Sequence, residues 1–191
     1  MPSVDQQALA ARLGDGVRER PAGGFLRRFG DVVLIALSSA VPTMPFVATG
    51  KVGAPQRTFL AAALAKLGQL GLFRVVLIHH PPLPGQASWR RGLRDAKKLH
   101  DIVVANGAEL ILHGHNHEQT IRELETSTGI ATIVGVPSAS EAVEGRVPAA
   151  RYNEYLIARA GKGWSCEMIG RAVASAPEHV WEVERRTLKV G

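Results

Sequence analysis

Histidine is the residue type whose placement in this chain most clearly predicts chemistry. Of the seven histidines, three fall in the five-residue segment HGHNH, and two more, His79 and His80, stand together in HHPP. A neutral imidazole is the commonest side-chain ligand of transition metals and suits zinc, iron, manganese or nickel. Gly114 permits a sharp turn, and the i, i+2 spacing puts His115 and His117 on one side of an extended chain. The two segments therefore predict a metal site.

Short apolar runs that alternate with helical patterns indicate how the two segments are positioned. We expect strands at 31–39, 73–80 and 108–114 and helices at 55–68 and 91–106. An alternation of strand and helix is typical of a sheet with parallel crossover connections. Both histidine segments then lie at the carboxyl ends of strands in one sheet, which is where open α/β sheets form ligand sites.

The pattern changes after Gly129, where strand-like runs follow one another through short turns. A second, antiparallel sheet is expected from these runs, at 130–136, 151–160, 164–173 and 180–190. Residues 1–24 are different, because a short helix at 4–13 is followed by a loop-like stretch with no recognisable site. They are interpreted as a poorly defined N-terminal segment.

Not every histidine is expected to bind a metal. Successive side chains on a strand face opposite ways, so His79 and His80 are not both ligands, and one of them is expected to support the other. His113, which directly follows a buried run, is interpreted as a hydrogen-bonded structural residue. His100 and His179 stand apart from the other histidines and are interpreted in the same way.

Composition sets the class of protein. A chain of 191 residues with 46% hydrophobic residues is long enough for one domain with a substantial core. No apolar run is long enough to span a bilayer, and the first residues do not resemble a secretory signal, so a cytoplasmic protein is expected. The single cysteine, Cys166, agrees with a reducing compartment. The net charge of +6 keeps nucleic acid open as a partner, although the basic stretch 90–98 is interpreted first as a solvated helix face and only second as a patch that attracts phosphate.

HHPP and GHNH, separated by a helix and a strand, together resemble the C-terminal half of the calcineurin-like metallophosphoesterases, closest to the bacterial phosphodiesterase type. The resemblance covers roughly residues 25–175. It implies an α/β fold, a mixed-sheet sandwich (α/β/β/α), with two divalent ions (Mn, Fe or Zn) at the strand ends. It further implies that His79 and His115 bind one ion, that His117 binds the other, and that Gly114 keeps the turn, with His80 beside the site.

This sequence lacks several motifs of the family, so only part of the family's metal site is assigned to its residues. The family's earlier motifs, Asp-x-His, Gly-Asp-x-x-Asp and Gly-Asn-His followed by Asp or Glu, do not occur, and neither Asp15 nor Asp31 is given the bridging role. Two divalent ions close together need a bridging anion, which neutral imidazoles do not supply. We therefore expect one ion, and we interpret 25–191 as the C-terminal part of a metallophosphoesterase domain that lacks its N-terminal strands and self-associates.

The expected function is metal-dependent hydrolysis of phosphate mono- or diesters of small molecules by metal-activated water, incomplete in this chain and with no catalytic residue assigned. The alternative is a non-catalytic metal-binding or regulatory fragment of the same fold. The loop 83–92 offers three substrate-binding candidates, since Trp89 is able to stack on a base and Arg90 or Arg91 to meet a phosphate. An ordinary surface loop is the favoured interpretation of this segment, and substrate binding is the alternative.

Overall fold

A seven-stranded mixed sheet forms the centre of the protein. The computed structural model describes residues 18–19, 24–139, 150–173 and 180–191. The strand order is β1-β2-β3-β4-β5-β7-β6, in which β3, β4, β5 and β7 run parallel and the others antiparallel to their neighbours. The strands are β1 (Arg18–Glu19), β2 (Phe25–Phe29), β3 (Val32–Leu37), β4 (Phe73–Ile78), β5 (Leu110–His113), β6 (Thr120–Thr126) and β7 (Gly129–Gly135).

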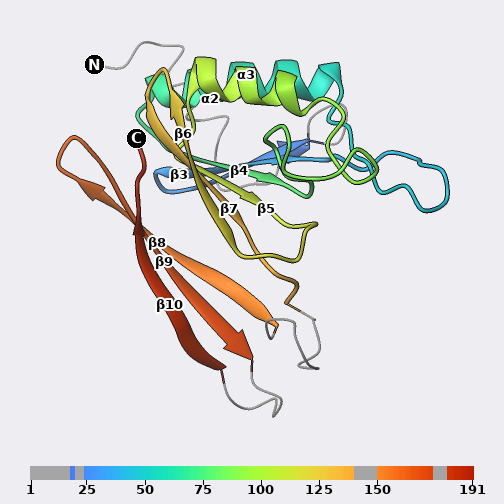
Figure 1. Cartoon of the computed structure of the whole chain (residues 1–191). Helices are drawn as coiled ribbons and strands as arrows, with labels where there is room; N and C mark the ends of the chain where they lie inside the picture. Colours follow the sequence, from blue (N-terminus) through green and yellow to red (C-terminus); the bar gives the residue numbers. More distant parts are fainter. Residues whose placement is uncertain (1–17, 20–23, 140–149, 174–179) are drawn as a thin grey trace.

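Two helices cover one face of this sheet (Figure 1). Helix α2 (Ala54–Gln69) begins with Pro55 in its first turn, where the missing N–H of proline costs nothing, and buries Leu60, Leu64 and Leu67. Helix α3 (Ala96–Asn106) buries Leu99 and Val103. These side chains pack against the alternate strand residues that face them, and together they form the larger of two hydrophobic clusters. The prediction of two crossover helices is confirmed, although α3 begins later than expected.

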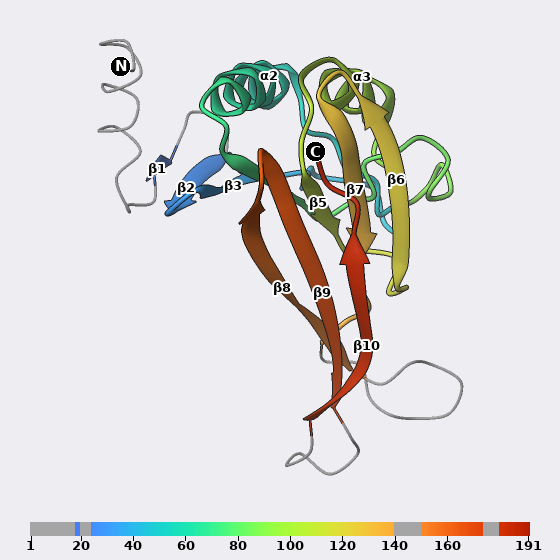
Figure 2. The same cartoon turned by 90° about the vertical axis from the view of Figure 1, so that its left-hand side faces the viewer.

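A three-stranded antiparallel sheet packs with part of its length against the other face and extends beyond it (Figures 1 and 2). It consists of β8 (Arg151–Ala160), β9 (Gly163–Val173) and β10 (Val180–Leu188) in the order β10-β9-β8. Cys166, Met168 and Leu188 pack on Phe73, Val75, Leu110 and Val134 of the first sheet and form the second hydrophobic cluster. The expected mixed-sheet α/β sandwich is therefore present in the described part of the chain as three layers, helices, large sheet and small sheet. The second helical layer of the expected α/β/β/α arrangement is not found among the described residues.

One sequence-based expectation about the sheets is wrong. The run 130–136 was assigned to the second sheet, but it forms β7, which pairs in parallel with β5 and in a hairpin with β6. Ala131 to Gly135 are buried, as expected for a strand covered on both faces, and this pattern distinguishes β7 from the half-exposed strands of the small sheet. The strands β2 and β6 were not expected, and the helix expected at 4–13 lies outside the described residues.

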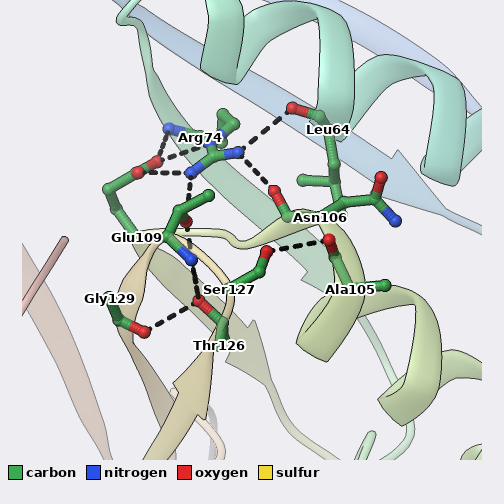
Figure 3. Close-up of polar contacts among 9 residues, drawn as sticks. Leu64, Arg74, Ala105, Asn106, Glu109, Thr126, Ser127 and Gly129 are labelled. Atoms are coloured by element: carbon green, nitrogen blue, oxygen red, sulfur yellow. Dashed lines mark hydrogen bonds and ion pairs between the residues drawn. The ribbon is translucent and has the colours of Figure 1, made fainter.

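A buried ion pair holds the amino-terminal ends of the parallel strands, opposite the histidines (Figure 3). The Arg74 guanidinium donates to both carboxylate oxygens of Glu109, and also to the backbone oxygens of Leu64 in α2 and Asn106 at the end of α3. Arg74 and Glu109 are 2% and 6% exposed, so their charges are compensated by each other and by these hydrogen bonds. The pair fixes β4, β5 and both helices relative to one another, and so sets the positions of the strand ends that carry the histidines.

Candidate metal centre

His79 and His115 meet at the carboxyl edge of the large sheet. His79 follows the last residue of β4, and His115 stands two residues after the end of β5. The Nε2 atom of His79 lies 3.1 Å from Nδ1 of His115, and the ring centroids are 5.0 Å apart. The Gly114 N–H donates to the His79 carbonyl oxygen at 3.1 Å and ties the two turns together. Two of the three expected ligands are thus brought together by adjacent parallel strands.

The backbone at the H-x-H segment is strained. His115 and His117 have φ of 71° and 57°, in the left-handed region that residues with a side chain rarely adopt. Gly114 was expected to provide the sharp turn, yet the left-handed conformations fall on the two histidines instead. Such strain costs of order 1–3 kcal/mol per residue and persists where the surrounding structure enforces it, most often at functional sites. The conformation orients the two imidazoles at a local energetic cost.

His80 is held by hydrogen bonds on both ring nitrogens. Its Nδ1 lies 2.8 Å from the Ser39 hydroxyl and its Nε2 lies 3.1 Å from the Ala48 carbonyl oxygen. Since a carbonyl only accepts, Nε2 carries the proton and Nδ1 accepts from Ser39. Burial lowers the pKa of His80, which keeps it neutral. Both ring nitrogens of His80 are therefore used, and the residue has no lone pair left for a metal ion. Instead, His80 fastens the loop after β3 next to His115. The ring centroids of His80 and His115 are 4.4 Å apart.

The support depends on a glycine. A Cβ added to Gly50 would lie 2.5 Å from Nδ1 of His80, closer than side-chain carbons approach in proteins. The loop after β3 therefore passes His80 closely only because Gly50 has no side chain.

His115 is electrically neutral and has an unused ring nitrogen. Burial lowers its pKa to about 4, the neighbouring His80, His79 and Arg91 add to the effect, and a contact with the Arg91 backbone opposes it in part. Its Nε2 is buried and has no hydrogen-bond partner. A buried polar nitrogen left unpaired costs free energy, so it marks a place where a partner is expected. A neutral imidazole with a free nitrogen is what a metal ligand requires.

His117, the third expected ligand, stays a prediction. Its side chain is exposed. Within the described ranges, no three His, Cys, Asp or Glu side chains are placed so that they could hold a metal ion. The donor set around His79 and His115 therefore fits an ion only in part: two imidazoles stand together, and no described carboxylate joins them.

His113 occupies a second polar spot that the sequence did not reveal. Its side chain is buried, and its Nδ1 lies 3.1 Å from the Gly114 carbonyl oxygen. Its Nε2 and the Thr120 hydroxyl are both buried without a partner. A Cβ on Gly135 would lie within 3.1 Å of both atoms, so the two strands flanking β7 bring them together above this glycine. His113 was expected to be a hydrogen-bonded structural residue. This holds for its Nδ1, whereas its Nε2 has no partner.

The loop after β4 contributes Arg91 to the neighbourhood of the histidines. The Arg91 guanidinium donates to the His115 carbonyl oxygen at 3.3 Å, and the Asn116 amide donates to the Gln86 carbonyl oxygen at 2.9 Å. Arg90 instead lies over the Trp89 ring, 5.0 Å from its centroid, and Trp89 is 79% exposed. Of the three substrate-binding candidates, Arg91 is thus the one that the structure brings into contact with the His115 turn.

Comparisons with known proteins give a partial match. No family model matches the chain. A probable cyclic nucleotide phosphodiesterase of Synechococcus sp. (strain WH7803) is 34% identical over 92 residues, which cover 47% of this chain and 34% of that protein. The chain therefore spans about a third of the length of the curated relative it matches. With the layers described above, this match supports a metallophosphoesterase-like α/β sandwich as the fold class.

Solved structures give only distant likenesses. A dimetal phosphatase from Danio rerio aligns with a TM-score of 0.46 and 14% identity over 74% of this chain and 40% of the other. A Vps29 double mutant from Entamoeba histolytica aligns with a TM-score of 0.34 and 13% identity over 83% of this chain and 99% of the other. At these scores neither likeness carries an argument about ligands or activity.

Proposed function

We propose that the chain is a metal-dependent phosphoesterase, acting on phosphate mono- or diesters of small molecules, with its metal site at His79 and His115. The observation that carries the proposal is the buried, unpaired Nε2 of a neutral His115 beside His79 at the carboxyl edge of a parallel sheet. The partial sequence match to a protein named as a cyclic nucleotide phosphodiesterase supports the same class of reaction.

Each residue has a distinct part in this proposal. His79 and His115 would hold a divalent ion (Mn, Fe or Zn) through ring nitrogens. His117 is the third proposed ligand, and its exposed side chain moves toward the pair to reach the ion. Gly114 keeps the two turns joined through its N–H. A bound ion of this kind supplies hydroxide from bound water and neutralises phosphate oxygens.

Arg91 is the proposed phosphate contact. Its guanidinium already lies against the His115 carbonyl, and a planar guanidinium is suited to two oxygens of a phosphate. Trp89 and Arg90 are proposed only as outer contacts, because they pack on each other. One ion is proposed for this chain, since imidazoles bring no negative charge to offset a second.

A second candidate is a non-catalytic metal-binding or regulatory role. It is favoured by the lack of a carboxylate beside the histidines in the described part of the chain. Without a negative ligand or a positioned general acid, an ion would be held while hydrolysis stays slow. Both candidate functions require a bound metal ion, and only the phosphoesterase requires catalytic turnover.

The test combines metal content with activity. Purified protein loaded with Mn or Zn is analysed by isothermal titration calorimetry and then assayed on bis(p-nitrophenyl) phosphate. The proposal expects about one ion per chain and turnover above a metal-only control, both lost in His115→Ala. The matched control is His100→Ala, which removes a histidine on α3 that pairs with Asp101. Binding without turnover would favour the regulatory role, and the absence of His115-dependent binding would exclude both.

A further inference from the structure

Two loops at the carboxyl edge of the sheet present large apolar side chains to solvent. Met44, Phe46 and Trp89 are 75%, 100% and 79% exposed. The loop after β3, which carries Met44 and Phe46, reaches outward beside the loop that follows β4 (Figure 1). Backbone hydrogen bonds join the two loops, from Ala48 N–H to the Arg90 oxygen at 2.9 Å and from Gly50 N–H to the Gly92 oxygen at 3.2 Å. The apolar tips are therefore carried on one connected surface.

Phe46 is held outward by a strained turn. The Val47 N–H donates to the Met44 oxygen at 3.1 Å, and the Thr43 hydroxyl donates to the Val47 oxygen at 2.6 Å. Pro45 and Phe46 are the central residues of this turn, and Phe46 has φ of 63°. This is the arrangement of a type II turn, whose third residue is normally glycine because its φ is positive. A fully exposed phenylalanine gains no packing within the chain in return for this strain, so its benefit lies in a contact outside it.

The surroundings of the tips are positively charged. No aspartate or glutamate occurs between Asp31 and Asp95. Asp95 is buried, where its carboxylate accepts from the backbone N–H groups of Val52 and Gly53 and pairs with Arg57. The exposed cations around the two loops are Lys51, Arg90, Arg91 and Arg94. Exposed apolar side chains surrounded by cations are complementary to a surface with an anionic outer layer and an apolar interior.

We propose that Met44, Phe46 and Trp89 insert into an anionic lipid surface, with the cations of the same two loops against lipid phosphates. Peripheral proteins bind bilayers by this combination of buried apolar area and electrostatic attraction. No helix in the described ranges is long and apolar enough to cross a bilayer, and insertion of loop tips requires none. The docking needs no metal ion, although it uses Trp89, Arg90 and Arg91 of the loop that is also proposed to meet substrate.

Other partners fit the surface less well. Single-stranded nucleic acid is bound by aromatic rings interleaved with cations along a groove. The outermost segment, 42–46, carries two prolines, a methionine and a phenylalanine, and its hydroxyl, on Thr43, is used within the turn. This segment has nothing to offer a phosphate backbone, whereas it suits a hydrocarbon interior.

The test is co-sedimentation of the full chain with vesicles of phosphatidylcholine, with or without phosphatidylglycerol. We expect binding to the mixed vesicles that weakens with salt and is much lower on phosphatidylcholine alone. Phe46→Gly should lower the partition coefficient at least about tenfold, because a phenylalanine side chain is no longer buried. The same variant should not lower the thermal midpoint, since glycine relieves the strain at this position. Leu156→Ser, which changes a 54% exposed leucine on β8, is the matched control and should bind as the parent does.

Trp89 gives a second, independent readout. Its fluorescence should shift to shorter wavelength and be quenched by brominated lipid on binding, and Trp89→Phe should abolish both changes. Equal vesicle binding by Phe46→Gly and the parent would overturn the proposal. So would binding to single-stranded oligonucleotides, lost in Phe46→Gly, in the absence of any binding to anionic vesicles.

Discussion

His115 presents its Nδ1 to His79 at 3.1 Å and leaves its buried Nε2 without a hydrogen-bond partner. The two residues come from the ends of adjacent parallel strands, and His80 lies beneath them with both of its ring nitrogens satisfied. One histidine of the HHPP segment therefore stabilises the site while the other remains available to a ligand.

Acid should destabilise the protein before its carboxylates are protonated. Burial lowers the pKa values of His80, His113 and His115, the last to about 4. Below the ordinary histidine value of 6.5 the unfolded chain takes up protons that the folded chain does not, so stability falls as pH falls from 6.5 toward 4. Urea midpoints measured from pH 7.5 to 4.5 should decrease across this window. The decrease should be smaller in His113→Gln than in the parent protein. If the variant showed the same pH dependence as the parent, burial of a neutral His113 would not be a cause of the acid destabilisation.

Removing one partner of the buried ion pair should be far more damaging than removing an exposed one. Arg74→Ala leaves the Glu109 carboxylate buried without a counter-charge, and a loss of about 3–5 kcal/mol in the free energy of unfolding is expected. Arg185→Ala removes a half-exposed guanidinium that pairs with Glu182 and Glu167 in contact with solvent, so its effect on the free energy of unfolding should be much smaller. Urea denaturation of both variants makes the comparison. Equal losses would show that the pair in Figure 3 does not hold the strands as described.

Gly50→Ala should disturb the metal centre from a distance. The added methyl group would meet the His80 ring, so His80 has to give up its hydrogen bonds to Ser39 and Ala48, at a cost of roughly 1–3 kcal/mol. Gly163→Ala is the control, because its Cβ would make only an ordinary contact of 3.9 Å. Calorimetry should show weaker metal binding and a lower thermal midpoint for Gly50→Ala alone.

Arg91→Ala should weaken substrate binding if the proposed function holds. Loss of a charge-assisted hydrogen bond to phosphate predicts an increase in KM of about tenfold with a smaller change in kcat. Arg90→Ala, which removes an outer contact that packs on Trp89, should raise KM clearly less than Arg91→Ala does. Steady-state kinetics on a phosphodiester distinguishes the two, and an equal effect of both substitutions would remove the special role of Arg91.

The sequence predicts strands and helices where hydrophobic periodicity is strong and local. The buried runs of β3, β4 and β5 and the amphipathic pattern of α2 are of this kind, and they placed both histidine segments at one sheet edge. The assignment of β7 failed because pairing partners are chosen by packing between segments far apart in the chain, which one buried run does not encode. The role of His80 depends on Ser39 and Ala48 in a remote loop. The left-handed conformation of His115 falls where the sequence suggested that Gly114 would make the turn. Neither feature has a local sequence signal.

In the proposed site, His115 offers its free Nε2 to a metal ion shared with His79. The most direct measurement is anomalous diffraction from crystals grown with zinc. We expect a peak about 2.0–2.1 Å from Nε2 of His115 and from a ring nitrogen of His79, the usual zinc–nitrogen distance. The peak should disappear in His115→Ala. A crystal that binds zinc only at other residues, or keeps full occupancy beside His79 in His115→Ala, would contradict the account.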